Sequence, residues 1–239
     1  MGRFFLVRHA QASFLGRNYD KLSATGENQA RLLGEYWARR NQVFDRVYSG
    51  PCARHTDTAR IAGEAFGRAG VPWPELVPMQ EFDEYQADAV IEQALPRLVE
   101  TSSEIRDLHR AFRNCVSPAE QLKSFQRMYE VIIRKWVDGE LALKDVESWG
   151  EFCARVHGGL LQVLADGGHG NQVAVFSSGG PMGVAMQRAL NLSPDVTMRV
   201  AWMTRNCAFS EFLFSGDRFT LSSFNAFPHL EDASLLTYR

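Results

Sequence analysis

A short apolar segment that leads directly into serines and glycines constrains the fold of this chain more than any other feature. Residues 173–183 read VAVFSSGGPMG. An apolar run followed by small residues is typical of a buried parallel strand that passes at once into a helix, with Pro181 in the first helical turn. Serines in such a turn stand at the carboxyl end of the strand, where open α/β sheets bind ligands. We therefore expect the side chain of Ser178 to face a ligand.

The first part of the chain alternates between strand and helix in the same way. Residues 3–7 (RFFLV) and 44–50 (FDRVYSG) predict two strands. An amphipathic helix is expected from Thr25, the candidate N-cap, and another over residues 51–65. Strands that alternate with helices predict an α/β fold with a mostly parallel sheet.

The middle of the chain has a different pattern. Residues 86–138 are charged, with apolar side chains spaced for amphipathic helices, and we expect a helical insertion over about 86–146 that covers the edge of the sheet. Near the C-terminus, Gly216 and Asp217 separate two strand-like runs and indicate a hairpin. A chain of 239 residues can bury one sizeable core. The prediction is a single domain over residues 1–239, a three-layer α/β sandwich with a mostly parallel central sheet.

Composition excludes several classes of function. The chain has 26 basic and 28 acidic residues, a net charge of -2, so nucleic acid is a poor candidate partner. No apolar run approaches the roughly 20 residues that span a bilayer, and the N-terminus lacks a secretory apolar region, so a cytoplasmic protein without a membrane partner is expected. The four cysteines are far apart and form no CxxC pair, which signals neither a disulfide framework nor a zinc site.

Arginine and histidine stand together where two of the predicted strands end. Arg8 and His9 follow the first strand directly, and Arg54 and His55 follow the second. Converging guanidinium groups suit a phosphate dianion, because their planar forks bind oxygens bidentately and stay charged. Positive neighbours also depress the pKa of a histidine, which keeps its imidazole neutral and nucleophilic. We infer that His9 can carry a phosphoryl group.

Four motifs in this chain resemble the ordered motifs of the histidine phosphatase superfamily, the phosphoglycerate-mutase-like group. They read LVRHAQAS, LSATGENQA, YSGPCARHTDTA and FSSGGPMG. The resemblance covers residues 3–66 and 147–230 and is weakest in the helical middle. The family's RHG appears here as Arg8, His9 and Ala10.

The resemblance implies a role for each of the matching residues. His9 is the phosphoryl-accepting nucleophile, while Arg8 and Arg54 bind the phosphate. Neither a cofactor nor a metal is implied.

The family also uses a carboxylic acid that protonates the leaving oxygen, and VPMQEFDEYQAD is similar to the segment that supplies it. Glu81 matches the usual position best, Glu84 is the nearest rival, and Asp83 is a weaker candidate. Such an acid needs a raised pKa in order to donate near neutral pH.

Ser178 departs from the family's pattern. In the motif similar to FSSGGPMG, the family has a second histidine immediately before the two glycines. A serine hydroxyl still donates a hydrogen bond to a phosphate oxygen but carries no charge, and loss of a preorganised donor commonly lowers rates by roughly 10²- to 10³-fold. His55 or His229 are the candidates to compensate. Otherwise the enzyme is slow, or the chain binds phosphate without turnover.

Two rival functions have weaker support. Ser178, Asp217 and His229 follow the chain order of a serine hydrolase, but Phe176 occupies the first glycine position of the nucleophile elbow. The glycines after Ser178 also resemble a dinucleotide-binding turn whose first glycine is replaced, and one such near miss is weak evidence.

The sequence thus predicts a metal-independent phosphatase that hydrolyses a phosphomonoester through a phosphohistidine on His9, with water as the final acceptor. A mutase is disfavoured, because the second histidine of the family is missing at Ser178. The expected partner is a small phosphorylated substrate or a phosphoprotein, which the sequence does not rank. It also sets no oligomeric state.

Overall fold

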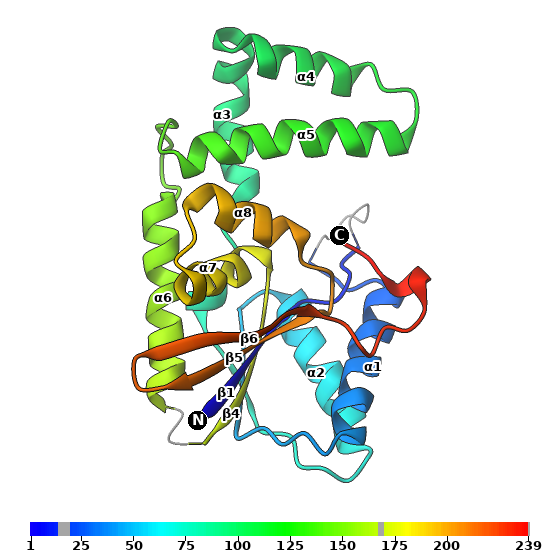
Figure 1. Cartoon of the computed structure of the whole chain (residues 1–239). Coiled ribbons are helices and arrows are strands. Elements are labelled where there is room, and N and C mark those ends of the chain that lie inside the picture. The colour runs from blue at the N-terminus through cyan, green and yellow to red at the C-terminus, as the bar shows by residue number, and fades with distance from the viewer. Residues whose placement is uncertain (14–19, 167–169, 239) are drawn as a thin grey trace. The chain divides into compact units, whose positions relative to one another are not determined.

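The computed structural model of this chain describes residues 1–13, 20–166 and 170–238. Its centre is a six-stranded sheet with the strand order β3-β2-β4-β1-β5-β6 (Figure 1). Strands β3, β2, β4 and β1 run parallel, and β5 and β6 are antiparallel to their neighbours. The α/β fold with a mostly parallel central sheet is therefore confirmed. The strands are β1 (Gly2–Arg8), β2 (Arg46–Ser49), β3 (Leu76–Pro78), β4 (Gln172–Ser177), β5 (Phe209–Ser215) and β6 (Arg218–Ala226).

Chain contacts divide the molecule into two compact units, residues 1–84 with 154–239 and residues 85–153. In the first unit, α1 and α2 lie on one side of the sheet, and α6 and α7 lie on the other (Figure 1). The helices are α1 (Ala24–Arg39), α2 (Ala53–Gly67), α3 (Ala87–Thr101), α4 (Ser103–Arg113), α5 (Pro118–Val137), α6 (Trp149–Asp166), α7 (Gly179–Leu190) and α8 (Pro194–Met203), with short 3-10 helices η1 (Gln80–Phe82) and η2 (Ala233–Leu235).

Strand β1 is apolar on both faces, and each face packs against a different layer. Phe5 and Val7 belong to the core that α1 and α2 cover. Phe4 points to the opposite face, where its ring packs edge-on against Phe212 and Phe219 with centroids 6.1 and 5.7 Å away. Side chains alternate between the faces of a strand, so a strand buried on both faces reads as the continuous apolar run seen here.

The predicted element boundaries need small corrections. Ser23, not Thr25, is the N-cap of α1, because its hydroxyl accepts a hydrogen bond of 3.0 Å from Gly26 N. The predicted hairpin is confirmed, with β5 and β6 joined at Gly216 in the left-handed conformation (φ +54°). Strand β3 and helix α8 were not predicted, since a three-residue strand is too short to show a periodic pattern.

Residues 85–153 form a small helical unit that contains α3, α4 and α5. Its core is aromatic: Tyr85 stacks on Trp136 with ring centroids 5.1 Å apart and packs edge-on against Phe152. Among the described residues of the whole chain, no helix combines the length and the apolar character needed to cross a membrane.

The sheet register brings the ends of three parallel strands to one level. Arg8, the last residue of β1, pairs with Ser177, the last residue of β4. On the other side of β4, Ser49 at the end of β2 pairs with Phe176. The segments that follow these strands therefore begin at the same edge of the sheet.

Candidate active site

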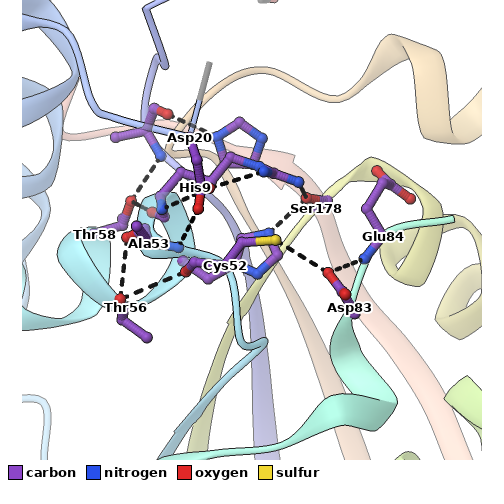
Figure 2. Close-up of polar contacts among 12 residues, drawn as sticks. His9, Asp20, Cys52, Ala53, Thr56, Thr58, Asp83, Glu84 and Ser178 are labelled. Atoms are coloured by element: carbon purple, nitrogen blue, oxygen red, sulfur yellow. Dashed lines mark hydrogen bonds and ion pairs between the residues drawn. The ribbon is translucent and has the colours of Figure 1, made fainter. Parts of the chain in front are cut away.

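Five buried polar residues gather at this carboxyl edge. They come from the end of β1, the first turn of α2 and the residue that precedes α7, and each is at most 9% exposed. Figure 2 shows this region with its polar contacts. We call the group the strand-end cluster: Arg8, His9, Arg54, His55 and Ser178. The structure thus brings together most of the residues that the sequence pointed to.

His9 is held by its backbone and by one ring nitrogen. Its backbone N donates to Ser177 O at 2.7 Å, and Asn206 Nδ2 donates to its carbonyl oxygen at 3.2 Å. The ring Nδ1 lies 2.8 Å from Ala10 O. A carbonyl oxygen only accepts, so in the neutral ring Nδ1 carries the proton and Nε2 carries the lone pair.

The electrostatic surroundings keep this ring neutral. Burial lowers the pKa of His9 well below its usual value, and the positive charges of Arg8 and Arg54 lower it further. Burial and charge repulsion therefore act in the same direction. The result is a neutral imidazole beside two guanidinium groups.

Arg54 is oriented by an acidic residue that the sequence analysis missed. Its Nη1 forms an ion pair of 2.9 Å with Asp20 Oδ1. Asp20 also accepts from the backbone N of Ala53 at 2.8 Å (Figure 2), at the start of α2, where the N-cap Cys52 makes no side-chain cap bond. A carboxylate at a helix N-terminus accepts hydrogen bonds from the free N–H groups and interacts favourably with the helix dipole. No local sequence pattern predicts this role of Asp20, because it stands 34 residues from Arg54 in the sequence.

Two further contacts fix the arginines. The guanidinium of Arg8 donates through Nη1 to the carbonyl oxygen of Thr204. Thr58 Oγ1 donates to Arg54 O at 2.6 Å and accepts from Ala10 N at 3.0 Å, which ties α2 to the segment after β1. Thr58 lies one helical turn after Arg54, so both face the sheet edge.

His55, one of the two candidate compensating residues, lies inside the strand-end cluster. Its Nε2 is 2.6 Å from Ser178 Oγ, and its ring centroid is 5.7 Å from that of His9. Burial and then the charge of Arg54 lower its pKa well below the usual value. Ser178 Oγ also accepts from Arg54 Nη2 at 3.4 Å.

His229, the other candidate, belongs to a different environment. Its ring stacks on Phe209 at a centroid distance of 6.3 Å and lies 6.1 Å from the ring of Tyr36. Burial lowers its pKa to about 4. The contacts of His229 are thus those of a core residue.

The two glutamates proposed as the acid point to different places. Glu84 Oε2 accepts from the backbone N of Gly180 at 3.2 Å, at the same helix start that carries Ser178. Glu81 lies in η1 with its side chain against Gly159 of α6, where an added Cβ would approach Glu81 Cβ to 2.5 Å. Glu84 therefore has the contact with the helix start after β4.

Asp83 takes part in the one group of potential metal ligands found among the described residues. Ligand atoms of Cys52, His55 and Asp83 lie within 4.8 Å of one another. Cys52 Sγ donates to Asp83 Oδ1 at 3.1 Å, and burial raises the pKa of this thiol to about 12. Metals bind the thiolate, so a metal at this group would have to displace the proton that the Cys52 thiol donates to Asp83.

Sequence comparison assigns the family. Residues 4–132 and 89–226 match the model of the histidine phosphatase superfamily (branch 1). A comparison with curated proteins finds no match.

Solved structures show the same fold at low identity. A histidine-to-alanine mutant of phosphoserine phosphatase from Entamoeba histolytica, in complex with phosphoserine, is 17% identical with a TM-score of 0.63, and the match covers 96% of this chain and 100% of that one. A putative alpha-ribazole-5'-P phosphatase from Escherichia coli is 16% identical with a TM-score of 0.63, and the match covers 95% of this chain and 98% of that one. Phosphoglycerate mutase from Bacillus anthracis is 14% identical with a TM-score of 0.60, and the match covers 95% of this chain and 94% of that one. The match to the family model over most of its length shows that this chain belongs to the histidine phosphatase superfamily.

Proposed function

We propose that this protein is a metal-independent phosphatase that hydrolyses a phosphomonoester through a phosphohistidine on His9. The observation that carries the proposal is the hydrogen bond from His9 Nδ1 to Ala10 O. It leaves the lone pair on Nε2, and the lowered pKa of His9 keeps that lone pair unprotonated at neutral pH. Arg8 and Arg54 supply the positive charge that a phosphoryl group in transfer requires.

The reaction has two steps. In the first, His9 Nε2 attacks phosphorus, the bond between phosphorus and the leaving oxygen breaks, and the carboxyl of Glu84 donates its proton to that oxygen. In the second, water attacks phosphorus, the phosphorus–nitrogen bond breaks, and the Glu84 carboxylate takes a proton from the water. The contact of Glu84 with Gly180 N at the start of α7 favours it over Glu81 as the acid.

A serine nucleophile is the second candidate, because 2.6 Å between Ser178 Oγ and His55 Nε2 is the distance of a nucleophile and its base. A base in such a site is oriented by a third group, but His55 Nδ1 has no hydrogen-bond partner among the described residues. This reading also leaves the paired arginines beside His9 without a role. We therefore favour histidine as the nucleophile.

The substrate class is a small phosphomonoester or a phosphoprotein. Related structures carry the names of phosphatases for phosphoserine and alpha-ribazole-5'-P, so the family scaffold accommodates substrates of different shapes. The identities of 16–17% to these structures transfer the fold but not a substrate.

The test is hydrolysis of para-nitrophenyl phosphate by the purified protein and by His9→Ala in the presence of a metal chelator. We expect turnover that survives the chelator and falls by at least about 10³-fold in His9→Ala. With a substrate radiolabelled at phosphorus, rapid quenching should leave an acid-labile label on the wild-type chain. This label should be absent from His9→Ala. Turnover equal in both proteins would refute the proposal, and turnover lost on chelation would implicate the Cys52, His55 and Asp83 group instead.

A further inference from the structure

The hydroxyl of Ser178 is not used for the task that a serine at this position usually performs. Ser178 is the N-cap of α7, where a serine side chain normally accepts a hydrogen bond from the first helical turn. Here it makes no cap bond and instead contacts His55 at 2.6 Å and Arg54 at 3.4 Å. Ser178 is 1% exposed and His55 is fully buried, so α2 determines where the hydroxyl points.

The hydrogen-bond valences of the three side chains indicate where the protons lie. A guanidinium only donates, so Ser178 Oγ accepts from Arg54. His55 Nδ1 is buried without a partner among the described residues, and buried N–H groups without an acceptor are rarer in proteins than unsatisfied acceptors. The proton of neutral His55 is therefore on Nε2 and is donated to Ser178 Oγ.

Among the contacts of the described residues, this arrangement leaves one donor unused. A serine hydroxyl has two acceptor lone pairs and one hydrogen. Arg54 and His55 occupy both lone pairs, so the hydrogen of Ser178 is available to a third atom. Donors that already accept hydrogen bonds are polarised and donate more strongly in a region of low dielectric constant.

We propose that His55 positions Ser178 so that its hydroxyl donates a hydrogen bond to a phosphoryl oxygen, and that the two residues act as one unit. The proposal rests on the phosphatase function proposed above and adds a positioning residue to it. In this chain, a histidine from α2 and a serine from the end of β4 together serve the position where related chains have one histidine. The His55 ring, 5.7 Å from that of His9, places the unit beside the proposed nucleophile.

The experiment is a double-mutant cycle on kcat for para-nitrophenyl phosphate. Ser178→Ala and His55→Leu should each lower kcat by about 10²-fold, the usual effect of removing one preorganised donor. The double variant should lose no more than Ser178→Ala alone, because neither residue works without the other. Ser177→Ala is the matched control on this substrate. That neighbouring hydroxyl donates to Phe82 O in the segment before Glu84, and para-nitrophenolate leaves without an acid, so kcat should stay within about three-fold.

A conservative variant guards against a folding defect. His55→Gln retains a terminal N–H at the position of Nε2 and should keep at least about a third of the wild-type kcat. A loss in His55→Gln as large as in Ser178→Ala would overturn the proposal. So would unchanged kcat in His55→Leu, or losses that add in the double variant while melting curves show folded protein.

Binding of inorganic phosphate, measured by titration calorimetry, separates this inference from the proposed function. Ser178→Ala and His55→Leu should each weaken phosphate binding by about 10-fold, without a further loss in the double variant. Wild-type protein without turnover dependent on His9 would refute the phosphatase, and this binding cycle would still decide the role of His55. Equal phosphate affinities in all four proteins would overturn the inference, whatever the activity.

Discussion

Two buried histidines, His55 and His229, show how the same side chain serves different ends in one molecule. Both are almost inaccessible to solvent, at 0% and 4% exposure. Burial depresses the pKa of each. His55 faces a hydroxyl and a guanidinium, whereas His229 lies against Phe209 and Tyr36.

The difference between them lies in the charged neighbours. The charge of Arg54 contributes to the depressed pKa of His55, while burial is the only lowering influence on His229. A phosphoryl group entering the strand-end cluster would meet positive charge and a hydroxyl donor, whereas the described contacts of His229 include no charged group. Burial of an imidazole alone therefore does not indicate a functional site. We expect changes in the cluster to affect rate and changes around His229 to affect stability.

The largest change in rate that would test the role of the cluster is expected when the carboxylate of Glu84 is replaced. Glu84→Gln should lower kcat for an alkyl phosphate by roughly 10²- to 10⁴-fold, because an alkoxide leaves poorly without a proton. The amide keeps an acceptor for Gly180 N, so the fold should persist. Para-nitrophenolate leaves without assistance, so the loss on para-nitrophenyl phosphate should be smaller.

Glu81→Gln is the control for that measurement. Its side chain packs against Gly159, outside the strand-end cluster, and kcat should stay within about three-fold of the wild type. If Glu81→Gln lost activity on alkyl phosphates while Glu84→Gln kept it, the acid would be the residue that the family resemblance first favoured.

The second effect concerns stability in acid. The pKa of His229 is about 4 in the folded chain and near 6.5 when unfolded. Between these values the unfolded state binds a proton that the folded state excludes, so stability is full above the unfolded pKa and falls as the pH drops. The contribution lost between pH of about 7.5 and about 4.5 is roughly 2.5 kcal/mol.

Urea unfolding of the wild type and His229→Phe at both pH values measures this contribution. Protonation of the other buried histidines destabilises both proteins. The difference between the pH-dependent losses of stability in the wild type and in His229→Phe therefore isolates His229. The loss in His229→Phe should be smaller by roughly 2.5 kcal/mol. Activity at the higher pH should be unchanged, and a fall in kcat without a fall in stability would contradict the division between cluster and core.

The sequence allowed a prediction of the cluster's location but not of its internal contacts. Arg8 and His9 follow an apolar run, and Ser178 follows another, so parallel pairing of β1 and β4 was enough to bring them together. The bond between His55 and Ser178 joins residues 123 positions apart and depends on how α2 packs, which no local pattern describes.

The choice between Glu81 and Glu84 also required the structure. Both lie in one acidic segment, and the short helix η1 turns Glu81 toward α6 before the chain extends to Glu84. Because η1 is a single turn, its periodicity is too brief to detect in sequence. Asp20 was not predicted for a related reason. A carboxylate that caps a helix from a distant part of the chain lacks the sequence spacing of a local cap.

The smallest effect tests whether residues outside the cluster influence the rate. Arg155 of α6 donates through Nη1 to the carbonyl oxygens of Gln80, Glu81 and Asp83, at 3.0 to 3.2 Å. These carbonyls belong to the segment that immediately precedes Glu84. We expect Arg155 to position Glu84, the proposed acid, by fixing its backbone.

Arg155→Met should therefore lower kcat for an alkyl phosphate by about 10-fold, since small misplacement of a catalytic group slows a reaction that depends on orientation. KM should change little, because the arginines that we propose bind phosphate are untouched. The same variant should lose less on para-nitrophenyl phosphate, as Glu84→Gln does, and that shared dependence on the leaving group separates a displaced acid from a general folding defect. Arg199→Met, which breaks an exposed ion pair of 3.0 Å with Asp195, controls for the loss of a surface charge. An equal fall in kcat on both substrates would show that Arg155 supports the fold and not the acid.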